Sequence, residues 1–169
     1  MARSELERIT DDKIAHGGVL VRMFLDMQNT EREKLQPLML DLVNERLLKE
    51  HGVVYCYGQI EEPLERDGVF TASATITLLA EGYAPLLRIA FNYAPAGIEI
   101  LRPAGNMQFS TAELQSMLMD ISQISVAYAT YILERVLKPE DASRIIKDLE
   151  ERAASGRRHM ENAKRGPHD

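Results

Sequence analysis

The chain has 169 residues, 45 % of them apolar and 27 % charged, and these values are typical of one globular domain with a buried core. Its formal net charge of −6 disfavours general binding to nucleic-acid phosphates or anionic lipid headgroups. The one cysteine, Cys56, cannot form an internal disulfide, and without an apolar leader or a membrane-length apolar run we expect a cytoplasmic protein with no membrane partner.

The first predicted elements are an N-terminal arm and a strand. Residues 1–17 are polar, and we expect a flexible arm or a short helix. Residues 19–27 are rich in β-branched and bulky side chains without a helical period. They are predicted as a strand, with a buried helix as the alternative.

A helix is predicted over residues 31–51. Thr30 and Glu33 have capping-box spacing, and Gly52 can end the helix in a left-handed conformation. Pro37 lies beyond the first turn, so either the helix kinks there or its regular part begins nearer residue 36. The apolar face repeats at i, i+3, i+4 and i+7 and consists of Leu35, Leu38, Met39, Leu42, Val43 and Leu47.

The middle of the chain changes to a period of two, which is typical of strands that have one buried face. Strands are predicted over residues 53–60, 69–79, 86–93 and 97–102, with a turn over residues 61–68. The clearest alternation sets Phe70, Ala72, Ala74, Ile76 and Leu78 against Thr71, Ser73, Thr75 and Thr77.

Two helices are predicted after the strands. A second capping box, Ser110 to Glu113, opens a long helix over residues 111–137 with an unusually wide apolar face, which needs cover on more than one side. Pro139 begins a final helix, and residues 156–169 are expected to form a flexible charged tail. The residues proposed for an interface on the long helix are Met117, Ile121, Ile124, Tyr128 and Tyr131.

The element order β-α-β-β-β-β-α-α predicts an α+β fold. We expect a two-layer sandwich in which a mostly antiparallel sheet of about five strands carries helices on one face. Residues 18–155 would form a single domain between the arm and the tail.

Three segments carry a resemblance: YGQIEEPLERDG, IEILRP and MLMDISQISVAYATYILERV. Together they resemble a family of small, uncharacterised archaeal proteins, chiefly from methanogens, over roughly residues 53–136. The resemblance implies an archaeal cytoplasmic setting. It supplies no catalytic residues.

The common catalytic and metal-binding motifs do not occur. No glycine-rich phosphate loop precedes a helix, the four histidines are scattered, and Cys56 alternates with core positions. We therefore expect no catalytic residues, metal or cofactor. The most distinctive polar cluster is an acidic turn, whose carboxylates could bind a cation but are more often solvated: Glu61, Glu62, Glu65 and Asp67.

A second candidate site is the polar face of the predicted sheet. Aromatic, hydroxyl and cationic side chains on one face could hold a small polar ligand or stack bases, although solvated sheet faces often carry threonine and tyrosine. The candidate ligand-binding residues are Tyr55, Tyr57, Thr75, Arg88 and Asn92.

Three functions follow from these features. The leading hypothesis is a non-catalytic interaction or regulatory module that self-associates, or binds a protein partner, through the helix over residues 111–137. The alternatives are a small-molecule-binding protein or minor enzyme that uses the polar sheet face, and a nucleic-acid-associated protein that uses the basic C-terminal tail.

Overall fold

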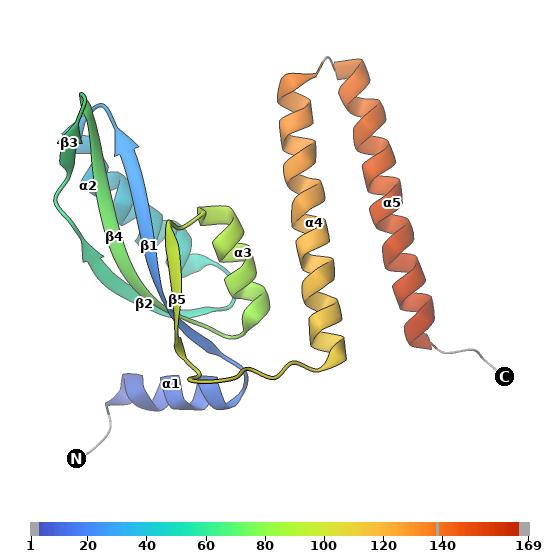
Figure 1. Cartoon of the computed structure of the whole chain (residues 1–169), viewed down its shortest axis with the longest axis horizontal. Helices are drawn as coiled ribbons and strands as arrows, with labels where there is room; N and C mark the ends of the chain where they lie inside the picture. Colours follow the sequence, from blue (N-terminus) through green and yellow to red (C-terminus); the bar gives the residue numbers. More distant parts are fainter. Residues whose placement is uncertain (1–3, 138, 166–169) are drawn as a thin grey trace. The chain divides into compact units, whose positions relative to one another are not determined.

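The computed structural model describes residues 4–137 and 139–165. Contacts along the chain separate into two compact units, Met1–Gln108 and Phe109–Asp169 (Figure 1). Unit 1 contains a sheet and its covering helices, and unit 2 contains two long helices. The sequence prediction of one domain over residues 18–155 does not separate these units.

Unit 1 is built on a five-stranded antiparallel sheet with the strand order β2-β4-β1-β5, in which β3 also pairs with β4 (Figure 1). The strands are β1 (Val19–Asn29), β2 (Val53–Ile60), β3 (Leu64–Arg66), β4 (Val69–Ala80) and β5 (Gly97–Arg102). The prediction of strands near residues 19–27, 53–60, 69–79 and 97–102 is confirmed. The α+β class is also confirmed.

The hydrophobic core lies on one face of this sheet. Alternate residues of β1 and β4 are almost fully buried there. For β4, the alternation of apolar and polar residues in the sequence had predicted this buried face. Two helices cover the face, α2 (Arg32–Asp41) and α3 (Tyr83–Tyr93). The core is made by Val19, Val21, Met23, Leu25, Leu35, Met39, Val43, Leu47, Ala72, Ala74, Ile76, Leu78, Ala80, Leu86 and Ile89.

The segment predicted as a strand over residues 86–93 is instead part of α3, so this prediction is wrong. Its apolar residues fit both periods, and Leu86 and Ile89 are buried at helical spacing. The sheet topology supplies the reason. Strands β4 and β5 are both antiparallel to β1 and therefore parallel to each other, and parallel strands need a crossover connection.

The same argument applies to β1 and β2, which flank β4 and are joined through α2. The complete βαββαβ path, with both crossover helices on one face, is the topology of the ferredoxin-like fold. Strand β3 and the N-terminal helix are additions to it. The predicted run of four strands over residues 53–102, with no helix between them, is thus replaced by two split βαβ units.

The first long helix differs from its prediction at both ends. Glu31, not Thr30, caps α2, and its backbone N–H donates to Oδ1 of Asn29, so the predicted capping box does not form. After α2 the chain continues through a π-helical turn, η1 (Leu42–Arg46), and a 3₁₀ turn, η2 (Leu47–Lys49). Gly52 then takes the positive φ of 89° that the sequence predicted.

The N-terminal segment forms helix α1 (Glu5–Ala15), with a capping box between Ser4 and Glu7. The short-helix alternative is therefore the one observed from Ser4 onward, and residues 1–3 of the predicted arm lie outside the described residues.

The predicted turn over residues 61–68 contains strand β3. Asp67 and Gly68 link β3 to β4 and both have positive φ, as tight hairpins of the I′ type require.

Unit 2 consists of α4 (Thr111–Val136) and α5 (Pro139–Arg165). The predicted capping box of Ser110 and Glu113 is confirmed, and it fixes the start of α4. Helix α5 begins at Pro139 as predicted but continues past Gly156 to Arg165, where the sequence suggested a flexible tail. Residues 166–169 of that predicted tail lie outside the described residues.

Candidate functional site

The five residues proposed as a ligand site do not lie together. Tyr55, Tyr57 and Thr75 share the sheet face opposite the core, because their neighbours in the strands point into the core. Arg88 and Asn92 belong to α3, which covers the core face. Arg88 donates a hydrogen bond to the backbone oxygen of His51 at 3.3 Å, and this bond links α3 to the connection before β2.

The face opposite the core is partly aromatic. The rings of Tyr55 and Tyr57 stack with centroids 6.0 Å apart, and Tyr57 remains 54 % exposed. Phe24 on β1 lies opposite Thr75 and is 41 % exposed. Arg22 of β1, which sequence analysis did not single out, also lies on this face, and its guanidinium is paired with Glu99 at 2.8 Å. The face therefore presents rings and hydroxyls together with the ion pair of Arg22 and Glu99.

Helix α1 covers one end of this same face. The hydroxyls of Thr10 and Tyr55 are 2.8 Å apart, and Asp11 pairs with Arg102 at 2.8 Å. Lys13 pairs with Glu81 at 2.9 Å, and this hydrogen bond lowers the pKa of Glu81. Leu79, which shares the face, is fully buried. Helices thus lie against both faces of the sheet, whereas the prediction placed them on one.

All four carboxylates of the acidic turn are exposed: Glu61, Glu62, Glu65 and Asp67. Glu62 lines a shallow hollow with Arg32, Glu33 and Gln36 from the start of α2. Open to water, these carboxylates lack the desolvation that general acid–base chemistry requires.

Cys56 lies half-buried against the core, as predicted, and burial raises the pKa of its thiol. Among the side chains that the structure describes, no group of three His, Cys, Asp or Glu residues could hold a metal ion. Over the same residues, no helix combines the length and apolarity of a membrane span.

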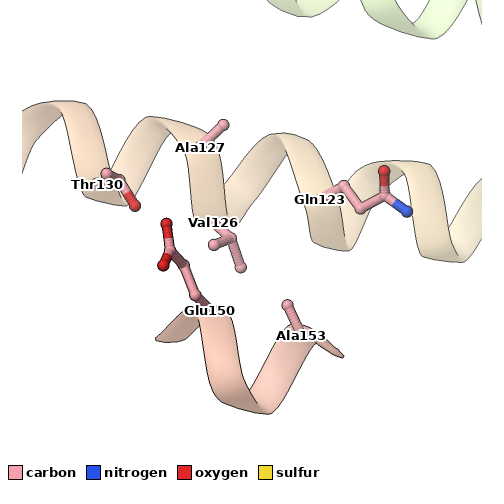
Figure 2. A pocket seen from close by; sticks show the side chains of 6 residues that line it. All are labelled: Gln123, Val126, Ala127, Thr130, Glu150 and Ala153. Atoms are coloured by element: carbon pink, nitrogen blue, oxygen red, sulfur yellow. The ribbon is translucent and has the colours of Figure 1, made fainter. Parts of the chain in front are cut away.

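One side of α4 packs against α5. Figure 2 shows Val126 and Thr130 of α4 pointing toward Glu150 and Ala153 of α5 across a groove between the two helices. Leu133 follows at the same helical spacing and, like Val126 and Thr130, is half-buried. This side of α4 is therefore partly covered within unit 2.

The other side of α4 carries an exposed stripe. All of α4 is described, and none of its residues is buried. Five apolar side chains of the stripe are between 40 % and 59 % exposed. The stripe follows a 4-3-4-3-4 spacing and lies roughly 140° around the helix from the side that faces α5. We define the exposed stripe as Leu114, Leu118, Ile121, Ser125, Tyr128 and Ile132.

The predicted interface overlaps this stripe only in part. Ile121 and Tyr128 belong to it, whereas Met117, Ile124 and Tyr131 lie on its flank. The positions that sequence analysis missed are Leu114, Leu118, Ser125 and Ile132. The signal was present, because a 4-3 spacing is the heptad pattern of coiled-coil seams. The spacing was not recognised because other apolar residues of this wide face lie between the stripe positions.

The comparison with protein families identifies the chain. The MJ0538 family matches over residues 20–131, which is most of unit 1 and most of α4. The chain belongs to the MJ0538 family. This is an uncharacterised family, as the resemblance suggested, and membership assigns no residue role. Neither the curated proteins nor the solved structures gave a match.

Proposed function

We propose that this member of the MJ0538 family is a non-catalytic interaction module that forms a homodimer through the exposed stripe of α4. The observation that carries the proposal is the stripe itself. An amphipathic helix normally buries one apolar face, and the side of α4 that packs against α5 is already partly buried. A second apolar face with heptad spacing is what a helix presents to another helix.

The size of the surface fits a dimer. With Tyr131 and Val136 added, seven apolar side chains expose between 40 % and 73 % of their area. At roughly 200 Å² per residue they present roughly 700 Å² per chain, close to the ~800 Å² that each partner buries in a standard stable interface. A contiguous apolar patch of this size is larger than most monomeric proteins expose.

The direct test is a charge placed in the stripe. Leu118→Glu would bury two carboxylates in each dimer, and we expect the dimer dissociation constant to rise at least ~30-fold. Light scattering and analytical ultracentrifugation of the full chain would measure this. Ser116→Glu is the matched control, because it adds the same charge to an exposed position of α4 outside the stripe.

Circular dichroism separates lost association from lost folding, and Leu118→Ala, which keeps helix propensity, should weaken the dimer less. Wild-type protein that stays monomeric at about 100 μM would overturn the proposal. A Leu118→Glu chain that dimerises as well as the Ser116→Glu chain would also overturn it.

A further inference from the structure

We infer that the two α4 helices of the dimer run antiparallel, with Ile121 of one chain opposite Ser125 of the other. This inference rests on the proposed function, since it specifies how a second copy occupies the exposed stripe. In this register each of the six stripe residues of one chain lies opposite a stripe residue of the other chain. Leu114 lies opposite Ile132, Leu118 opposite Tyr128, and Ile121 opposite Ser125, each pair occurring twice.

Side-chain volume favours this orientation. In a parallel pair every stripe residue meets its own copy, so two Ser125 side chains would leave a gap one turn from two opposed Tyr128 rings. Gaps and overfilled layers both cost packing energy. In the antiparallel pair the small Ser125 lies opposite the larger Ile121, and Tyr128 lies opposite Leu118. Each layer then holds a similar volume.

Charge favours the same orientation. The 4-3 spacing continues from Ile132 to Arg135, whose guanidinium lies 4.1 Å from the ring centroid of Tyr131. A parallel pair would set the two Arg135 side chains against each other in the next layer. An antiparallel pair sets Arg135 opposite the partner's first turn, where Glu113 of the partner subunit carries the opposite charge. Opposed helix dipoles add to this preference.

Disulfide trapping tests the orientation in the full chain. Two variants would be made in a Cys56→Ala background, one with Leu114→Cys and one with Ile132→Cys. One of them would carry an added tag, so that the two chains differ in size, and they would be co-expressed and oxidised. The antiparallel register predicts a disulfide between the two kinds of chain. Each variant alone should give none, because positions 114 of the two chains would be about 27 Å apart along the helices. Ser116→Cys is the control outside the stripe.

The outcomes separate the two proposals. Disulfide-linked dimers of Leu114→Cys alone would show a parallel pair and overturn the orientation, while self-association would stand. A dimer by light scattering that gives no disulfide between the two chains would also overturn it. If light scattering shows the Cys56→Ala chain and the wild type to be monomers, the proposed function itself fails.

Discussion

At Gly58 the backbone of β2 passes so close to β4 that no side chain fits. A Cβ atom there would lie 2.1 Å from the backbone oxygen of Thr75 and 2.9 Å from the Cα of Ile76. Both are backbone atoms, so one strand would have to move. The residue type at this position is therefore dictated by strand pairing rather than by a turn.

Gly58→Ala should destabilise unit 1 by about 2 kcal/mol, because it forces β2 away from β4. Urea denaturation followed by circular dichroism would measure the loss. Gly156→Ala is a useful comparison, since a Cβ there meets nothing within 4 Å and alanine favours the helix. An unchanged unfolding midpoint for Gly58→Ala would contradict the close approach.

Individual residues also show where sequence reading succeeded. The alternation of Ala72, Ala74 and Ile76 against threonine and serine placed them correctly in the core, because a strand has only two faces. Arg88 and Asn92 were misplaced, because the period of two was applied to a segment that is helical. The polar face still carries a cation without them, because Arg22 lies there and is paired with Glu99.

Among the elements, α3 is held against the preceding helix region by a specific contact. Tyr93, at its last turn, donates from its hydroxyl to Oε1 of Glu50 at 2.9 Å. Partial burial and this bond to a carboxylate raise the pKa of Tyr93 to about 12. The bond joins the end of η2, the continuation of the α2 segment, to the end of α3.

Tyr93→Phe should lower the free energy of unfolding by about 1 kcal/mol at neutral pH, a value reduced for the partial exposure of the pair. Tyrosine titrates near pH 10 when unfolded, so the raised pKa means that folding favours the protonated hydroxyl. The stabilisation is complete below about pH 10 and is lost as pH rises toward 12.

Urea titrations of both proteins at pH 7 and across this alkaline range would measure the difference. Tyr57→Phe, on the exposed sheet face, should stay within about 0.5 kcal/mol of wild type. If Tyr93→Phe and wild type are equally stable at pH 7, the contact does not hold α3.

The two capping boxes show what an element's own sequence can fix. Ser110 and Glu113 cap α4 as predicted, with hydrogen bonds that lower the pKa of Glu113. Thr30 and Glu33 have the same spacing, but Asn29 at the end of β1 accepts from the backbone of Glu31 instead. The helix therefore begins one residue later than the spacing of Thr30 and Glu33 predicted, and no capping box forms there.

At the scale of the whole molecule, each core residue given above belongs to unit 1. We therefore expect a fragment of residues 1–108 to fold cooperatively, since it keeps its complete sheet and covering helices. It should also be monomeric, because it lacks α4.

Circular dichroism with thermal denaturation, and light scattering at the concentrations used for the full chain, would test both expectations. A fragment that unfolds without cooperativity would show that unit 1 needs unit 2. A fragment that dimerises like the full chain would place the interface in unit 1 and count against the stripe.

Four features could be predicted from the order of the residues alone: the class of the fold, the strands with clean alternation, the start of the long helix and the excess of apolar surface on it. These follow from short-range periodicity and capping, which depend on residues a few positions apart. Three features became clear from the folded chain: residues 86–93 are helical, α1 packs on the sheet, and one side of α4 is exposed. Those outcomes depend on strand order and on packing between segments far apart in the chain, which no local pattern encodes.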